Sequence, residues 1–389
     1  MKKNNITVVG GAGHIGLPLA LLFALNKISV NILDKNKDSL KKIKNKTMPF
    51  FENNGQELLD SAIQKNLLNF SDNIKKLFIN GPVIICIGTP VDEYGNPELK
   101  LIFDCLNEIK SKIKNKLIIF RSTLSPGSSR LIYNFLIDNK ITKKISFCPE
   151  RVLQGKSIEE IKNIPQIISA YDKESINYSK KIFSNITNKF IFSKPEEAEL
   201  AKLFTNSYRY IKFAIANQFY NISEDSNLNF HKIFNIMKEN YPRMANFPSP
   251  GFAAGPCLYK DTLQLASHYK NNFSLGHASL NINEGFIFTI IEKIKKYKKY
   301  NDLNVGLLGM SFKPNIDDTR VSLSYKLKKH LKFIVKNVYT HDPHVTTDKE
   351  LKNLNFVLKN SDIVVICIPH DYYKNIKFNH KKIIDIWGI

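Results

Sequence analysis

The sequence predicts an α/β protein in which two Rossmann-like, doubly wound domains are joined by a central helical region with a long helix. Three observations carry this prediction. The chain opens with a strand, a glycine loop, a helix and a second strand, a long amphipathic segment follows at 196–222, and new strand-like apolar runs begin near 303. Apolar runs that alternate with helical segments are typical of parallel sheets covered by helices. We expect domains at 1–195, 196–300 and 301–389.

The first element is a glycine loop, Gly11-x-Gly13-x-x-Gly16, between the strand ITVV and a helix through LPLALLFAL. Gly11 permits a tight turn, Gly13 lets the backbone approach a pyrophosphate, and Gly16 lets the helix pack on the strand. The second strand, VNILD, ends at Asp34, whose carboxylate can accept from a ribose 2′-hydroxyl. The pattern predicts a dinucleotide site that favours NAD over NADP, and Lys35 weakens that preference.

Further strands of the parallel type are expected at 82–88, 116–123 and 145–151. Ligands bind beyond the carboxyl ends of such strands, so Thr89 and Thr123 are candidates for the cofactor cleft. An ordinary turn residue is an equally good interpretation of Thr89 from its position alone. The strand at 145–151 ends near Glu150.

The segment 196–222 has apolar residues at three- and four-residue spacing and acidic residues after Pro195, as a helix N-terminus should. Lys202 and Asn206 project from the same face one turn apart. Taken alone, they read as a solvated pair. The segment is too long and too apolar on one side to be a connector, which predicts that it forms the hub of a homodimer.

The last part opens with NVGLLGMSFKPNIDDTR, which reads as a strand followed by a glycine-containing loop, and further strands are expected in NVYTHDP, SDIVVICIPH and KIIDIWG. The loop after the first strand holds Lys313, Asp317, Asp318 and Arg320. A lysine and an arginine at a strand end suit a diphosphate. This region therefore reads as a second α/β nucleotide-binding unit without a glycine fingerprint.

The five cysteines are scattered and lack CxxC or Cys/His spacing, so neither a disulfide framework nor a metal site is expected. Cys86 and Cys367 lie in apolar runs and read as buried structural thiols. Cys257, in GFAAGPCLYKD, lies in no such run. By itself it could be a small buried residue, a disulfide partner or a nucleophile.

Composition narrows the function further. The net charge is +22, but the lysines are spread over all regions, which argues against a nucleic-acid partner. The chain has no apolar run long enough for a transmembrane helix, so no membrane partner is expected. The N-terminus runs directly into a strand without an apolar leader, so we expect a cytoplasmic protein.

Taken together, the motifs resemble the UDP-glucose/GDP-mannose dehydrogenase family, the nucleotide-sugar 6-dehydrogenases, over essentially the whole chain. The matching segments occur in the family's order. They are GGAGHIGLPLA, GTPVDEYGNPEL, RSTLSPG, FCPERVLQG, EEAELAKLFTNSYR, GPCLYKD and SFKPNIDDTRVS.

The resemblance implies that a sugar C6 alcohol is oxidised to a carboxylate while two NAD are reduced. Cys257 matches the family's nucleophile, which adds to the aldehyde and passes through a thiohemiacetal and a thioester. Lys202 would stabilise the oxyanion, and Asp261, Asn206 and Thr123 would hold water. Glu150 matches a base for the final hydrolysis.

The resemblance also assigns binding residues. Arg243 resembles an arginine that reaches the substrate of the neighbouring subunit, with a plain surface arginine as the alternative. The expected cofactor contacts are Gly11, Gly13, His14, Ile15, Gly16, Asp34, Thr89, Thr123 and Arg320. The expected contacts with the UDP-sugar substrate are Glu150, Arg151, Val152, Leu153, Lys202, Asn206, Arg243, Phe252, Gly255, Lys260 and Lys313.

Some features depart from the family or leave the sugar open. Ala254 replaces one of two glycines usual before the cysteine. CPER resembles members that act on UDP-N-acetylhexosamines, whereas CLYKDT resembles the CLPKDT of UDP-glucose members. A non-catalytic protein that has kept the fold and a single-step NAD alcohol dehydrogenase are the alternatives. The first is disfavoured by the joint presence of Cys257, Lys202 and Asp261, and the second by Cys257.

Overall fold

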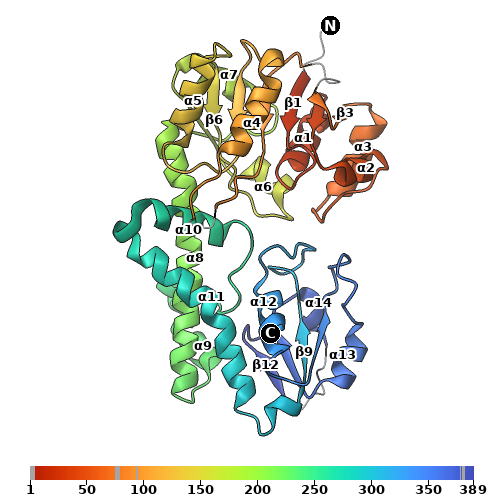
Figure 1. Ribbon diagram of the computed structural model, residues 1–389, viewed down its shortest axis with the longest axis vertical. Helices are drawn as coiled ribbons and strands as arrows, with labels where there is room; N and C mark the ends of the chain where they lie inside the picture. Colours follow the sequence, from red (N-terminus) through yellow and green to blue (C-terminus); the bar gives the residue numbers. More distant parts are fainter. Residues whose placement is uncertain (1–4, 75–78, 93–94, 377, 379–381) are drawn as a thin grey trace. The chain divides into compact units, whose positions relative to one another are not determined.

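A computed structural model describes residues 5–74, 79–92, 95–376, 378 and 382–389. Two parallel-sheet, Rossmann-like units and a long central helix confirm the expected fold class (Figure 1). Internal contacts divide the chain into compact units Met1–Phe204 and Thr205–Ile389, which are described separately below. Helix α8 (Pro195–Asp225) contributes to both units.

Within the described residues, the first unit has one eight-stranded sheet in the order β3-β2-β1-β4-β5-β6-β7-β8. All neighbouring strands are parallel except β6 and β7, which pair antiparallel. The reversal at β6 and β7 adds two strands to a six-stranded nucleotide-binding sheet. The strands are β1 (Asn5–Val9), β2 (Ser29–Leu33), β3 (Leu68–Ser71), β4 (Val83–Ile85), β5 (Ile118–Phe120), β6 (Ile145–Phe147), β7 (Gln166–Ala170) and β8 (Phe190–Ser193).

Helices cover both faces of this sheet, as a doubly wound fold requires. Helix α1 is apolar all round and nearly every residue in it is buried, because the sheet and other helices surround it. One core layer contains α1 (Gly16–Leu25), α2 (Lys37–Lys44), α3 (Gly55–Gln64), α6 (Ser157–Asn163) and α7 (Lys173–Phe183). The other contains α4 (Lys100–Ile109) and α5 (Ser128–Asp138).

The second unit has a parallel sheet of four strands among the described residues, in the order β10-β9-β11-β12. Helices α11 and α12 share a core with one face, and α13 packs near Leu308 and Val364 on the other. The strands are β9 (Asn304–Leu308), β10 (Asn337–His341), β11 (Ile363–Ile366) and β12 (Ile383–Asp385). The helices are α9 (Phe230–Lys238), α10 (Leu258–Tyr269), α11 (Ser274–Lys295), α12 (Leu323–Leu331), α13 (Leu354–Asn360) and α14 (Asp371–Lys374).

Side chains fix several of these helix starts. Asn36, Asp172, Asn229, Ser322 and Asn353 each accept a hydrogen bond from a backbone N–H in the first turn of the following helix. In the parts of the chain that are described, no helix has both the length and the apolar character needed to cross a bilayer.

Candidate functional site

The glycine loop has the shape that a dinucleotide site needs. A Cβ on Gly16 would lie 2.3 Å from the Gly10 carbonyl oxygen, and one on Gly11 would lie 2.8 Å from the Val8 oxygen. These two positions therefore need glycine for the fold itself. A Cβ on Gly13 would meet nothing closer than 3.5 Å. The fold itself therefore does not require glycine at position 13. The absence of a side chain there leaves room at the N-terminus of α1, where backbone N–H groups favour phosphate.

Asp34 is held against the same loop. Its carboxylate accepts hydrogen bonds from the N–H groups of Ala12 and Asn36, both at 2.9 Å. The Lys35 ammonium lies 3.3 Å from the Glu108 carboxylate on an exposed surface. Lys35 thus has an acidic neighbour of its own, and Asp34 is the acidic group at the end of β2 beside the glycine loop.

His14 connects the glycine loop to the loop after β6. Its ring lies 4.0 Å from the Phe50 ring, and its Nδ1 lies 3.1 Å from the Gln154 side-chain nitrogen. The amide nitrogen must donate, so we assign the ring proton to Nε2. Ile15 precedes α1 and is partly buried.

The loops after β4 and β5 are tied together. The Thr89 hydroxyl donates to the Thr123 carbonyl oxygen at 2.5 Å, and the Ser122 hydroxyl donates to the Ile87 carbonyl oxygen at 2.5 Å. Thr89 is therefore more than a turn residue, because it fixes the backbone at Thr123. Glu93 and Tyr94, which belong to the matching segment GTPVDEYGNPEL, lie outside the described residues.

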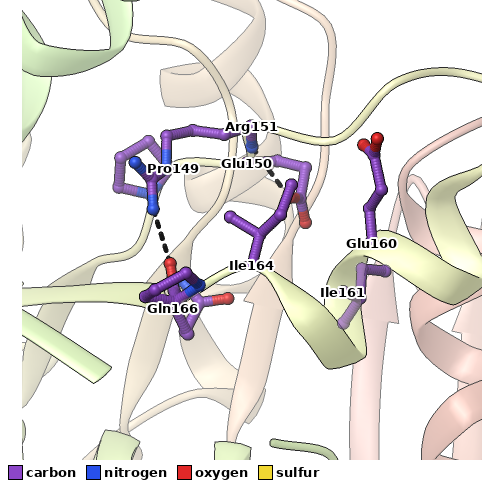
Figure 2. Close-up of a pocket in the computed structure, with 8 residues that line it drawn as sticks. Pro149, Glu150, Arg151, Glu160, Ile161, Ile164 and Gln166 are labelled. Atoms are coloured by element: carbon purple, nitrogen blue, oxygen red, sulfur yellow. Dashed lines mark hydrogen bonds between the residues drawn. The ribbon is translucent and has the colours of Figure 1, made fainter. Parts of the chain in front are cut away.

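The loop after β6 begins with Glu150. One carboxylate oxygen, Oε1, accepts from the N–H groups of Arg151 and Val152 at 2.8 and 3.2 Å, and the other forms an ion pair with buried Arg121. The Arg151 guanidinium donates to the Pro165 carbonyl oxygen at 2.6 Å (Figure 2). Glu150 itself is 7% exposed.

Two more carboxylates hold the rest of this loop. Glu160 accepts from the Leu153 N–H at 2.5 Å, and Glu52 accepts from the N–H groups of Gly155 and Ile158 at 3.1 and 3.0 Å. Burial raises the pKa of Glu52, although these hydrogen bonds act in the opposite direction. The amides of Arg151, Val152 and Leu153 are thus bonded within the protein, and the Leu153 carbonyl accepts from the Lys156 N–H at 2.9 Å.

A small cavity adjoins Glu150 (Figure 2). It offers about 10 Å³ to the centre of a water molecule, roughly the room for one water. A nucleotide sugar needs a site of several hundred cubic ångströms. The cavity is therefore too small to be the substrate site and has room only for a water molecule beside the carboxylate. Its lining residues are Pro149, Glu150, Arg151, Glu160, Ile161, Ile164, Pro165 and Gln166.

In the second unit, three of the expected site residues form one cluster. The Asn206 side-chain N–H donates to one oxygen of Asp261 at 2.6 Å, and the Lys260 ammonium lies 3.0 Å from the other. Asp261 is 1% exposed. Lys202, one turn before Asn206 on α8, is buried in the first unit.

Cys257 is exposed and stands at the N-cap position of α10, a helix of 12 residues. The Asp261 N–H donates to the Cys257 carbonyl oxygen at 2.9 Å, so the thiol and the Asp261 cluster lie on successive turns. A helix N-terminus stabilises negative charge and hence a thiolate. Burial raises the pKa of Cys86, Cys148 and Cys367 to about 12 and that of Cys105 to about 11.

The backbone before Cys257 has little freedom. Gly255 has a φ of +99°, and a Cβ there would lie 2.4 Å from the Phe312 ring. Ala254 does not have a positive φ and its side chain is buried, so alanine fits where the family usually has glycine. Phe252 is 3% exposed and packs edge-on against Phe286 in the core of the second unit.

The loop after β9 holds Lys313 and Arg320. The Arg320 guanidinium donates to both oxygens of Asp318, and this pairing raises the pKa of Arg320, with a smaller contribution from Cys257. Arg320 therefore lies within electrostatic reach of the thiol, which sequence reasoning did not anticipate. Arg243, in a short 3₁₀ turn, is exposed and donates to the Tyr241 hydroxyl at 3.1 Å.

The buried pair of Asp342 and His370 holds the same loop in place. The Asp342 carboxylate accepts from the N–H groups of Met310 and Ser311 at 2.6 and 2.9 Å and from His370 Nε2 at 3.1 Å. The Asn315 N–H donates to His370 Nδ1, which assigns the ring proton to Nε2. Burial alone would raise the pKa of Asp342, but the His370 hydrogen bond and the backbone N–H groups hold it well below its usual range.

Sequence reasoning missed Arg121, Glu52, Asp342 and His370. A usable signal exists for three of them, because Arg121, Asp342 and His370 follow the ends of predicted strands, where a charged or titratable side chain is informative. Glu52 lies in a long connection and gives no such signal.

Comparison with known proteins decides the family. Residues 4–187, 196–285 and 306–389 match the NAD binding, central and UDP binding domains of the UDP-glucose/GDP-mannose dehydrogenase family. The chain belongs to the UDP-glucose/GDP-mannose dehydrogenase family. Membership confirms the expected class, an NAD-dependent nucleotide-sugar dehydrogenase with a UDP binding domain.

Individual members of this family are similar along the whole chain. The UDP-N-acetyl-D-mannosamine dehydrogenase of Methanocaldococcus jannaschii is 31% identical, over 96% of this chain and 88% of its own. The UDP-glucose 6-dehydrogenase of Rickettsia prowazekii is 26% identical, over 96% and 91%. The structure of the Pyrococcus horikoshii UDP-D-ManNAc dehydrogenase matches with a TM-score of 0.90 at 25% identity, over 99% and 95%.

Proposed function

We propose that this protein oxidises the C6 hydroxyl of a UDP-sugar to a carboxylate in two NAD-dependent steps through a thioester on Cys257. The observation that carries the proposal is the exposed Cys257 at the N-terminus of α10, one turn before the buried Asn206–Asp261–Lys260 cluster. A core thiol or a disulfide partner has no need of this position. A nucleophile needs both exposure and a site that favours its anion.

The residues of the first unit fit NAD. Gly11, Gly13, His14, Ile15 and Gly16 form the turn at the N-terminus of α1, and the cradle at Gly13 is open. Asp34, fixed by the Ala12 N–H, would accept from the adenosine ribose. Thr89 and Thr123, tied to each other, would line the cleft beyond β4 and β5. When bound, NAD accepts one hydride in each oxidation.

Cys257 acts between the two oxidations. An aldehyde carbonyl cannot release a hydride until a nucleophile has added, so the thiolate attacks the carbonyl carbon and forms a thiohemiacetal. Oxidation of that adduct gives a thioester, and water then cleaves its C–S bond to release the acid and restore the thiol. Lys202 would stabilise the oxyanion of both tetrahedral states.

The remaining polar residues would control water. Asp261, held by Asn206 and Lys260, would orient the water near the thioester together with Thr123. Glu150 would take the proton from that water. Of the four lone-pair positions on its carboxylate, the contacts within the described chain occupy three, two on Oε1 and one on Oε2.

The proposed substrate is UDP-N-acetyl-D-mannosamine. The CPER motif supports this sugar over UDP-glucose, as do the names of two relatives that are 31% and 30% identical to this chain. Lys313 and Arg320 would hold the diphosphate, and Lys260 could assist. The loop from Glu150 to Leu153, with Arg151 and Val152, would contact the sugar, together with Lys202, Asn206, Phe252 and Gly255.

The proposal includes a homodimer with Arg243 reaching the partner's substrate. Exposed apolar residues recur on one face of α8 at Tyr208, Ile215, Phe219 and Ile222, which supports a packed interface there. The proposed domains are 1–195 for NAD, 196–300 for the interface and the nucleophile, and 301–389 for the UDP-sugar. A thiol nucleophile needs a reducing compartment, which supports the cytoplasm.

The test is product analysis with a panel of UDP-N-acetyl-D-mannosamine, UDP-N-acetylglucosamine, UDP-glucose and GDP-mannose. We expect the highest kcat/KM with the first, two NADH per sugar acid and little aldehyde in solution. One NADH per product would point to the single-step alcohol dehydrogenase. NAD binding without turnover of any sugar would point to a non-catalytic protein.

A further inference from the structure

Arg121, directly after β5, is the largest side chain that the described fold buries completely. Its Nη1 donates to the side-chain oxygen of Gln166, at the start of β7, at 2.8 Å, and its Nη2 pairs with Glu150. Its guanidinium lies 5.1 Å from the centre of the Phe183 ring. The side chain thus connects β5, the loop after β6, β7 and helix α7.

The charge of this side chain demands an explanation. Arginine stays protonated even where burial lowers its pKa, as it does here. A buried charge is tolerated only beside an opposite charge. The neighbouring thiols Cys86 and Cys148 do not provide one, because burial raises their pKa to about 12. Among the described residues, Glu150 is the carboxylate paired with Arg121.

An interior that needed only stability would be served as well by apolar side chains of similar size. The pair instead lies where two adjacent parallel strands end, and the rest of the Glu150 carboxylate holds the Arg151 and Val152 amides. Arg121 therefore fixes one oxygen of Glu150 while the other oxygen sets the turn.

We propose that Arg121 is a positioning residue that fixes the Glu150 carboxylate and, through it, the turn of residues 150–152. Its effect on turnover rests on the proposed function, in which Glu150 takes a proton from water. The effect on the turn does not depend on it. Arg121 is not itself placed in contact with substrate.

The proposal has a pH signature. The charged group paired with Glu150 is Arg121, and Arg151 and Glu160 line the same small cavity, with the Arg151 guanidinium bonded to the Pro165 carbonyl. Removing Arg121 deletes the cation in contact with the carboxylate and leaves the Glu160 charge, so the pKa of Glu150 must rise. Since a base works only when deprotonated, the acid limb of the pH–rate profile moves to higher pH.

The first experiment needs no substrate. Amide hydrogen exchange of residues 150–153 is compared in wild type, Arg121→Met and the control Arg130→Met, whose arginine is half-exposed and pairs with Glu196. We expect exchange to accelerate at least about tenfold in Arg121→Met only, because the turn loses its anchor. Unchanged exchange in Arg121→Met would overturn the proposal, whatever the protein turns over.

The second experiment measures kinetics with UDP-N-acetyl-D-mannosamine and UDP-glucose as probes. For Arg121→Met, we expect kcat to fall by at least about tenfold, an acid limb shifted to higher pH and NAD affinity close to wild type. Arg121→Lys keeps the positive charge, so the acid limb of its pH–rate profile should return toward the wild-type pH. A loss of kcat without any shift of the limb would assign Arg121 a structural role only.

A double variant, Arg121→Met with Glu150→Gln, removes both charges and keeps the test available if the single variant does not fold. If Arg121 acts through Glu150, the double variant is no slower than Glu150→Gln alone. Additive losses would overturn the proposal. If wild type oxidises neither probe while loop exchange still responds to Arg121→Met, the proposed function fails and the positioning role stands.

Discussion

At the scale of single residues, Cys257 differs from the other four cysteines in where the chain places it. The others are fully or partly buried among apolar side chains, and burial raises their pKa to about 11 or 12. Cys257 is exposed at a helix N-terminus. The difference comes from the sequence, because Gly255 and Pro256 interrupt regular secondary structure just before helix α10 starts.

Replacing Cys257 with serine tests the nucleophile. We expect kcat for the acid to fall by at least about 10³-fold, because a serine hydroxyl is not ionised near neutral pH. The NAD dissociation constant, measured by titration, should stay within about twofold, since the glycine loop lies in the other unit. Cys105→Ser, on α4, is the control and should keep its activity. A Cys257→Ser protein with wild-type turnover would exclude the thioester route.

Asp34 tests the choice of cofactor. Its carboxylate would repel a 2′-phosphate, and Lys35 has Glu108 for a neighbour. We expect kcat/KM to favour NAD over NADP by at least about 100-fold, because bringing like charges together costs several kcal/mol. Asp34→Ala should lower the ratio of kcat/KM for NAD to that for NADP, mainly because NAD binds more weakly. Comparable use of both cofactors by wild type would mean that Lys35 governs the site.

At the scale of elements, two loops depend on buried carboxylates. Glu150 holds the turn after β6, and Asp342 holds the loops after β9 and β10. In each case backbone N–H groups converge on one side chain, so a single substitution releases several hydrogen bonds at once.

For Asp342→Asn we expect a loss of about 3 kcal/mol in the stability of the second unit at neutral pH, because His370 and the amides lose their anionic partner. The folded pKa of Asp342 is depressed, so its contribution is complete above the unfolded pKa of about 4 and is lost as pH falls through the folded value. The difference in unfolding free energy between wild type and Asp342→Asn should be constant from about pH 5 to 8 and should shrink below about pH 4.

Trp387 supplies the measurement, since it is the only tryptophan of the chain and lies in the second unit. Denaturant unfolding followed by its fluorescence gives the stability at each pH. Asp371→Asn, at an exposed carboxylate near the same loop, is the control and should have a much smaller effect. A gap that widens toward acid pH would contradict the assignment.

The apolar face of α8 tests the interface. Ile222 is 57% exposed and Phe219 is 41% exposed. We expect Ile222→Lys combined with Phe219→Lys to convert a dimer to a monomer in sedimentation velocity, with folding intact, because both side chains are exposed in the single chain. Leu131→Lys, at a similarly exposed leucine of α5, should leave the sedimentation coefficient unchanged. A wild-type monomer would refute the interface.

At the scale of the whole molecule, we expect subunits to complement each other. If Arg243 reaches the partner's substrate, heterodimers of inactive Arg243→Ala and inactive Cys257→Ser chains should recover up to about half of wild-type activity per site. One site in the mixed dimer then regains both groups. Activity is measured on heterodimers isolated with two different tags. No recovery in those heterodimers would contradict a shared site.

The sequence predicted the architecture well because its signals are local. The glycine spacing and the apolar strands at 82–88 and 116–123 each specify an element without knowledge of the rest, and β4 and β5 form where expected. The site was predictable only as a set of candidates. Which side chain meets which, such as Thr89 with the Thr123 carbonyl or Arg121 with Glu150, depends on strand order, which no short segment encodes.

The contrast between one exposed cysteine and four buried or partly buried ones makes the protein suited to titration by alkylation. Thiolate, not thiol, reacts with iodoacetamide, so the high pKa of the other four protects them at neutral pH. A single equivalent of reagent would then be consumed at Cys257. The fraction of chains that carry one carbamidomethyl group, measured by mass spectrometry, would give the fraction of sites with a reactive Cys257. This count needs no sugar substrate.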